Sequence, residues 1–227
     1  NSSSGKSSVV IENMNCKSFS EACTWKSRMK DILAKYTGKS LPKTIILLGQ
    51  EAWTSYLSQD SLISHDIPII GGMVSRNAVL LPEEGTDLEN WESESVDVIE
   101  DSVKKFHILG FAYEYDLEKN IELILDFYPN TKHIAFISDN SYGGVSIQAF
   151  VKKKMQEEYP DLDLILLDGR KYTVYSITDE IAKLPENTAI LLGTWRVDKN
   201  DGYFMRNATY SMMMTNPGLP TFTLTSI

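Results

Sequence analysis

The sequence is poor in the residues that build metal centres and disulfide scaffolds. It contains two cysteines and three histidines among 227 residues. Two cysteines are too few for a disulfide framework or for a cysteine-rich zinc site. The histidines, His65, His107 and His133, are scattered rather than placed at the close spacing of a zinc site. We therefore expect no metal and no cofactor, and we interpret each histidine as a surface or strand-edge residue.

Basic residues are also scarce. Lys and Arg number 22 against 31 Asp and Glu, which gives a net charge of −9. Nucleic-acid-binding proteins neutralise phosphates with clustered Lys and Arg, so no nucleic-acid partner is expected. The one basic run, Lys152–Lys154, is typical of a solvated helix face. Between Glu83 and Asp101 there are nine acidic residues and no basic one, a pattern typical of a solvated loop and helix face.

Long hydrophobic runs and catalytic signatures are missing as well. No run approaches the roughly 18 apolar residues of a membrane-spanning helix. The glycine fingerprint of dinucleotide-binding proteins, the phosphate-binding loop and the serine-nucleophile elbow are all absent. We therefore expect no catalytic residues in this chain. No charged-then-apolar signal peptide opens the sequence at Asn1, so the residues alone do not indicate a compartment.

The state of the two cysteines is left open by their spacing. Cys16 and Cys23 would lie about 10 Å apart along a continuous helix, which is beyond bridging distance. Free thiols are one interpretation. The alternative is a disulfide that closes a loop before the helix, which requires Cys16 to lie in that loop.

Short apolar runs alternate with segments of helical spacing, and this alternation predicts an α/β fold with parallel sheets. The expected buried strands are 9–11, 45–48, 67–70, 134–137, 164–167, 190–192 and 222–224. The expected helices are 20–36, 51–58, 117–127, 145–159, 176–183 and 202–213. The alternation is interrupted between Asn77 and Lys132, which divides the chain into an amino-terminal lobe, 1–112, and a carboxy-terminal lobe, 113–227.

The candidate binding residues follow the expected strands, because ligands of open parallel sheets bind outside the carboxyl ends of the strands. Glycine, amide, carboxylate and aromatic side chains there suit a polar ligand with apolar faces. The candidates are Gln50, Glu51, Gly72, Met73, Asp139, Asn140, Ser141, Tyr142, Trp195 and Arg196. We expect Tyr142 and Trp195 to face a cleft between the lobes, with core packing as the alternative. For the polar candidates, the alternative is ordinary turn chemistry and helix capping.

Several segments carry a resemblance to a known family. Residues 11–19, Ile-Glu-Asn-Met-Asn-Cys-Lys-Ser-Phe, resemble the Glu-Tyr-Met-Asp-Ser-Lys-Arg-Phe segment that precedes a helix in the extracytoplasmic sensor regions of bacterial hybrid two-component histidine kinases. Gly110-Phe111, residues 116–140 and residues 185–198 are similar to the same group. Asn15 stands where that pattern usually has Asp. These sensor regions resemble ABC-transporter substrate-binding proteins of the type I periplasmic class, in which two hinged Rossmann-like α/β lobes hold a ligand between them.

The resemblance implies a periplasmic sensor domain of an inner-membrane histidine kinase. Its expected partners are a small polar solute, with sugar-like compounds as one class, a second copy in a homodimer, and the membrane and kinase regions of the same polypeptide. Binding would be signalled by lobe or dimer rearrangement. The alternatives are a ligand-less dimerisation module of such a receptor and a free solute-binding protein of an ABC transporter.

The resemblance also implies a truncated chain. A complete first lobe would begin with a strand and a helix before residues 9–11, and a complete second lobe would continue past Ile227. An absent strand leaves an open sheet edge. We therefore expect self-association through the amino-terminal lobe, near residues 9–11 and the helix at 20–36.

Overall fold

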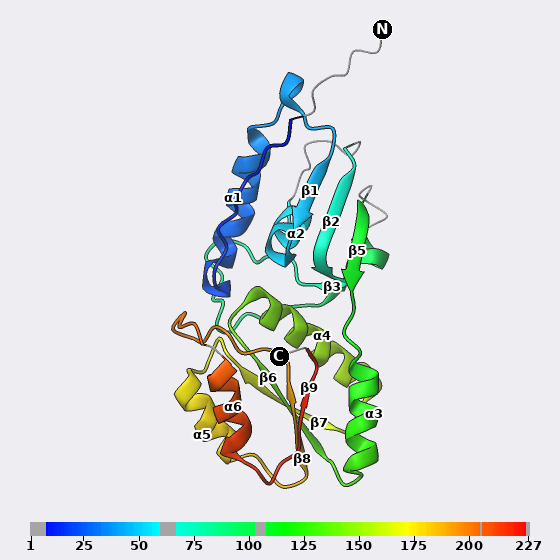
Figure 1. Cartoon of the computed structure of the whole chain (residues 1–227), viewed down its shortest axis with the longest axis vertical. Helices are drawn as coiled ribbons and strands as arrows, with labels where there is room; N and C mark the ends of the chain where they lie inside the picture. Colours follow the sequence, from blue (N-terminus) through cyan, green and yellow to red (C-terminus); the bar gives the residue numbers. More distant parts are fainter. Residues whose placement is uncertain (1–7, 60–66, 103–107, 205, 226–227) are drawn as a thin grey trace.

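Two parallel β-sheets, one above the other along the long axis of the molecule, form the framework of the structure (Figure 1). The computed structural model describes residues 8–59, 67–102, 108–204 and 206–225. Both sheets carry helices, so the expected α/β class with two parallel sheets is confirmed. His65 and His107 lie outside the described residues. Across the described residues, none of the helices has the length and apolar content that crossing a membrane requires.

The first half of the chain builds a three-stranded parallel sheet in the order β1-β2-β5. A short antiparallel pair, β3-β4, follows the carboxyl end of β2. The elements are η1 (Phe19–Glu21), α1 (Ala22–Ala34), η2 (Gly38–Ser40), β1 (Ile45–Leu48), α2 (Gln50–Leu57), β2 (Ile69–Ser75), β3 (Asn77–Ala78), β4 (Val96–Asp97), the π-helical turn η3 (Val98–Ser102) and β5 (Ile108–Tyr113).

The second half builds a four-stranded sheet in the order β7-β6-β8-β9, in which every pairing is parallel. Its elements are α3 (Leu117–Phe127), β6 (His133–Ser138), α4 (Tyr142–Glu158), β7 (Asp163–Asp168), α5 (Val174–Ala182), β8 (Thr188–Leu192), α6 (Arg206–Thr215) and β9 (Thr221–Thr223). The proposed boundary between the lobes, at residues 112 and 113, falls at the end of β5.

Helices cover the second sheet on both faces, as the continuous apolar strands require. Because side chains alternate along a strand, Ile134 and Phe136 of β6 pack with α3 and α4 on one face. Ala135 and Ile137 pack with α5 and α6 on the other face. This double coverage explains why the strands of the second half are the ones that the sequence predicts best.

The first sheet has one strongly exposed face. Leu47 and Ile69 point into a core formed with α1 and α2. Their neighbours on the opposite face remain accessible: Leu48 is 68% exposed, Leu109 68% and Phe111 91%. The inner core also receives side chains from the second half, because Tyr142, Val145 and Ala149 of α4 pack into it. The two halves therefore share a hydrophobic core through α4.

Three sequence-based expectations in the first half need correction. Residues 9–11 form no strand, and within the described residues no helix or strand precedes Phe19. Glu12 instead pairs with Lys35, and the Arg28 guanidinium donates to the Met14 carbonyl, so that the segment lies along α1. The strand expected at 67–70 continues to Ser75. Strand β5 was not expected, because it lies within the interrupted stretch.

Candidate functional site

The candidate site lies where the carboxyl ends of the two sheets meet, a region here called the junction. Strands β1, β2 and β5 run toward the second half of the molecule (Figure 1). Contacts join the loops on the two sides: the Phe19 amide donates to the Asn140 carbonyl at 2.8 Å. The Ser146 hydroxyl donates to the Asn77 carbonyl at 3.1 Å. Segments near the carboxyl ends of both sheets therefore come together at the junction.

Gln50 begins α2 directly after β1 and reaches across the junction. Gly49 precedes it with φ of +88°, a left-handed conformation that glycine adopts without strain. The Gln50 amide nitrogen donates to the Tyr113 hydroxyl at the end of β5. The same nitrogen lies 3.9 Å from the position that a Cβ on Gly143 would occupy. Gln50 and the first turn of α4 are thus neighbours, as the sequence predicts for two parts of one site.

Asp139, directly after β6, is fully buried and organises the loops around it. Its carboxylate accepts from the Ser141 amide at 3.0 Å and from the Arg196 amide at 2.7 Å. The Ser141 hydroxyl donates to it at 2.5 Å, and the Thr194 hydroxyl at 3.4 Å. These bonds hold the loops after β6 and β8 together. The Asp139 side chain therefore has a structural role in this conformation.

Asn140 and Ser141 also make contacts within the chain. The buried Asn140 amide nitrogen lies 3.3 Å from the Asp198 carbonyl and 3.4 Å from a carboxylate oxygen of Asp201. Ser141 caps α4, because its hydroxyl accepts from the Gly144 amide at 3.0 Å. Ser141 therefore both caps α4 and lies at the junction, where it is partly exposed.

Tyr142 reaches the junction but points into the core of the first half. Its hydroxyl donates to the Val79 carbonyl at 2.9 Å and accepts from the Val79 amide at 3.0 Å. Burial raises the pKa of this phenol to about 12. The side chain is 1% exposed, so it is a packing contact between the halves rather than an accessible wall of a cleft.

Trp195 does not face the junction, and that expectation is wrong. Its ring is 4% exposed and packs with the core of the second half, against residues of β6, α5 and α6. The preceding Gly193 leaves room for Phe136 rather than for a ligand, because a Cβ there would lie 2.7 Å from the Phe136 ring. Arg196 has an exposed side chain and contributes its backbone amide to Asp139.

The expected position of two further candidates also changes. Gly72 and Met73 lie inside β2 rather than after it, within the bulge between Gly71 and Val74. Met73 is 77% exposed with φ of +58°. The residues that do follow β2 are Arg76 and Asn77. Glu51, in the first turn of α2, is partly exposed at the junction side of the sheet.

The sequence reasoning missed a buried polar network beside the junction. The Ser138 hydroxyl donates to the Gln148 side chain at 2.6 Å, and Gln148 donates to the Asp168 carboxylate at 3.0 Å. Asp168 pairs with Arg170 at 2.6 Å, and both side chains are at most 7% exposed. Arg170 follows β7 at its carboxyl end, which is the signal that would have placed it in the candidate set.

Both cysteines are free. This confirms the free-thiol interpretation over the disulfide. Burial, with a contribution from the negative charge of Glu51, raises the pKa of the Cys16 thiol to about 12. The Cys23 thiol lies 3.3 Å from the Glu83 carbonyl, at the start of the acidic segment.

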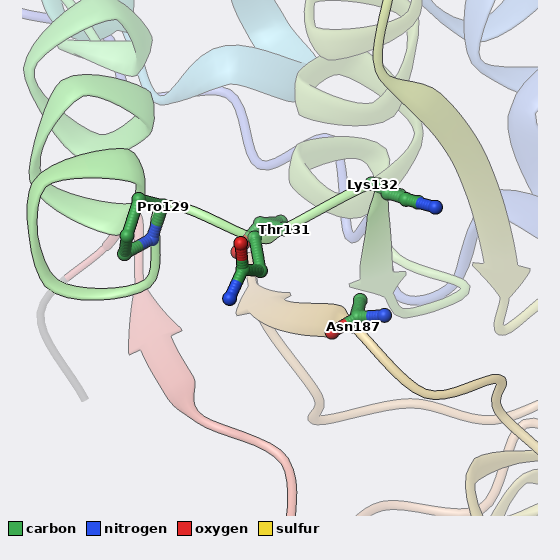
Figure 2. Close-up of a pocket in the computed structure, with 5 residues that line it drawn as sticks. Pro129, Thr131, Lys132 and Asn187 are labelled. Atoms are coloured by element: carbon green, nitrogen blue, oxygen red, sulfur yellow. The ribbon is translucent and has the colours of Figure 1, made fainter.

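Two cavities lie outside the loops that follow β6, β7 and β8. One, of about 470 Å³, is lined by Pro129, Asn130, Thr131, Lys132 and Asn187 (Figure 2). It lies beside the amino ends of β6 and β8, where the Lys132 amide donates to the Asn187 carbonyl, at the opposite end of the sheet from the junction. The other, of about 250 Å³, is apolar and lies beside β5, with Trp53 and Phe111 in its wall. Within the described residues, no three acidic, histidine or cysteine side chains come together as metal ligands.

Comparison with known proteins gives distant structural likeness and no sequence match. No protein-family model and no curated protein matches the chain. A conserved domain protein from Vibrio cholerae O1 biovar El Tor str. N16961 is 15% identical with a TM-score of 0.47, over 92% of this chain and 59% of that one. An ABC domain in complex with L-Trp from Streptococcus pneumonia is 13% identical with a TM-score of 0.44, over 87% and 59%.

A third similar structure is CD0873, a substrate-binding protein with adhesive properties from Clostridium difficile in its ligand-free, open form. It is 14% identical with a TM-score of 0.41, over 89% of this chain and 58% of that one. The chain thus spans less than two thirds of the length of these proteins. Likeness at these TM-scores is too distant to carry functional conclusions, which rest instead on the residues of the junction.

Proposed function

We propose that the chain is the ligand-binding sensor region of an extracytoplasmic receptor, attached to a two-component histidine kinase. It recognises a small polar solute at the junction and performs no catalysis of its own. In this proposal the sensor region lies in the periplasm, and the membrane and kinase regions belong to the same polypeptide. The two halves of the structure correspond to lobes 1–112 and 113–227.

The observation that supports this proposal is the meeting of two parallel sheets at their carboxyl ends. Open α/β sheets bind ligands outside those ends, where loops and helix amino termini present polar groups. Gln50, Ser141 and Arg196 come to the junction from different strands and retain exposure there. These side chains supply hydrogen-bond donors and acceptors of the kind that a hydroxyl-rich or amino-acid-like solute requires.

A specific observation favours a second candidate, a ligand-less module of the same kind of receptor. The side chains of Asp139 and Tyr142 form their hydrogen bonds with groups of the chain itself, and the two halves share a hydrophobic core through α4. A third candidate, a free solute-binding protein that delivers to a transporter, would use the same junction. The sequence that flanks this chain would distinguish the free solute-binding protein from the sensor region, because only the sensor region of a receptor continues into a membrane span and kinase motifs.

A thermal-shift screen of sugars, nucleosides and amino acids tests the first proposal against the second. A specific ligand at 100 times its Kd adds about 2.7 kcal/mol. For a chain of this length that is a rise in Tm of about 5 to 10 °C. We expect the rise to disappear in a Gln50→Ala/Arg196→Ala variant and to persist in Asn130→Ala, at the far end of the second sheet. No shift with any compound favours the ligand-less module, and a shift that survives the double variant places the site elsewhere.

We further propose that the chain forms a homodimer through its first half. The exposed apolar face of β1 and β5 supports this, because parallel sheets are normally covered on both faces. Val9 and Ile11 are also accessible, at 86% and 87%. We expect light scattering across a concentration series to show a dimer that Leu48→Glu or Val9→Glu/Ile11→Glu weakens. Phe127→Glu, on α3 of the second half, should leave it intact; a monomer at every concentration excludes the dimer.

A further inference from the structure

A short part of the acidic segment, residues 88–92, lies against the second half of the molecule and is here called the strap. Its anchor is Arg170, whose guanidinium donates to the Leu88 carbonyl at 3.0 Å and to the Trp91 carbonyl at 2.8 Å. Arg170 is itself held by the buried carboxylate of Asp168. A charged donor that is nine-tenths buried therefore binds two backbone carbonyls of a segment from the other half.

Two ion pairs flank this anchor. Glu89 pairs with Lys199 of the β8–α6 loop at 2.9 Å. Glu92 pairs with Lys152 of α4. These lysines belong to the second half, so the acidic residues are not simply a solvated face. Each pair is partly exposed and individually weak, but together they align the strap on both sides of Arg170.

An aromatic contact completes the cover over the loops. The Trp91 ring stacks on Phe19, with ring centroids 5.9 Å apart and an interplanar angle of 18°. Phe19 is fully buried, and its amide donates to the Asn140 carbonyl at 2.8 Å. The strap and Phe19 thus contact the loops after β6, β7 and β8. These are the loops at which a parallel sheet offers a ligand site.

We propose that the strap is an internal latch that covers the carboxyl end of the second sheet and holds the two halves together. Its release uncovers the loops after β6, β7 and β8, and a solute that binds those loops competes with it. The access role rests on the proposed solute-binding function. The latch itself rests only on contacts within the chain, so it can be tested without any ligand.

The test is hydrogen exchange in a charge-reversed variant, Lys152→Glu/Lys199→Glu. A matched control, Lys154→Glu/Lys183→Glu, makes the same change in net charge. Its two lysines form ion pairs close by in the sequence, Lys154 with Glu158 and Lys183 with Glu180, rather than with the strap. We expect amides 169–172, beside the anchor, to exchange about tenfold faster in the latch variant than in the control, because two weak pairs become repulsive. Amides of β8, in the core, should be unchanged.

A second experiment restores the two ion pairs between the strap and the second half. Adding Glu89→Lys/Glu92→Lys to the latch variant re-forms both pairs with reversed charge and should return exchange of amides 169–172 to the wild-type rate. Equal exchange in the latch variant and the control overturns the proposal, as does fast exchange that the fourfold variant fails to restore. If no solute gives a thermal shift but amides 169–172 exchange faster as expected, the solute-binding function is rejected and the latch is still supported.

Discussion

The two adjacent glycines at the start of α4 offer a sharp test of how the Asp139 loop is packed. A Cβ on Gly144 would lie 2.9 Å from the carbonyl carbon of Asp139, and closer still to that residue's carbonyl and carboxylate oxygens. The obstacle is backbone, which cannot swing aside as a flexible side chain can. A Cβ on Gly143 would find its nearest neighbours, Ser141 Oγ and Gln50 Nε2, at 3.7 and 3.9 Å, which is ordinary contact.

The comparison of Gly144→Ala with Gly143→Ala isolates that clash. Both substitutions gain helix propensity, up to about 1 kcal/mol, and this gain largely cancels in the difference. What remains is overpacking, which costs about 1 to 3 kcal/mol. We expect Gly144→Ala to be less stable than Gly143→Ala by about 2 kcal/mol, or about 4 to 8 °C in Tm.

Urea unfolding with linear extrapolation measures this difference, provided that the two variants share one m-value. A Gly144→Ala variant as stable as Gly143→Ala would refute the placement of the Asp139 backbone against the first turn of α4. The hydrogen bonds from the Ser141 and Arg196 amides to the Asp139 carboxylate would then lose their structural basis as well.

Two further predictions concern buried groups. Arg170→Met should lower the free energy of unfolding, measured in urea, by about 3 to 5 kcal/mol, because it leaves Asp168 as a buried carboxylate without its ion-pair partner. The double variant Arg170→Met/Asp168→Leu should recover part of that loss. A cost below about 1 kcal/mol for Arg170→Met, or a double variant whose cost equals the sum of the two single costs, would contradict this prediction. The pKa of the Cys16 thiol is raised to about 12, so Cys16 should be alkylated slowly at pH 8.5 in the folded chain and faster once urea unfolds it. The contribution of this neutral thiol to the stability of the fold should be complete below about pH 8.5 and should fall as the pH rises toward 12. Rapid alkylation of Cys16 in the folded chain would contradict the burial of this thiol.

Helix periodicity and apolar runs predicted the second half well. The helix expected at 117–127 coincides with α3, whose amino end is capped by Asp116. The run 9–11 misled because β-branched residues favour a strand only where a neighbouring strand supplies hydrogen bonds. Here the ion pair of Glu12 with Lys35 holds the segment along α1 instead. Pairing partners are a property of the whole fold, and a single run does not contain them.

The positions of some candidate residues could be predicted from the sequence, but their roles could not. The rule about carboxyl ends predicted that Gln50 and Asp139 lie near one another, and the structure places both beside the first turn of α4. The rule does not distinguish a buried side chain from one that faces solvent. Trp195 and Arg196 are adjacent in the sequence, yet Trp195 is buried and Arg196 is exposed. The strap was hidden for a similar reason, since the partners of Glu89 and Glu92 lie far away in the sequence.

The energetics of the junction favour local release of the strap over separation of the halves. Releasing the strap gives up two charge-assisted hydrogen bonds from Arg170, which are worth about 3 to 6 kcal/mol together. Separating the halves must in addition expose Tyr142 and Val145, at about 1.5 to 3 kcal/mol for each large side chain. A ligand shifts an equilibrium only by its differential affinity for the two states. A solute that needs strap release alone therefore has several kcal/mol less to overcome than one that needs a hinged opening, so under the proposed function solute binding would begin at the strap.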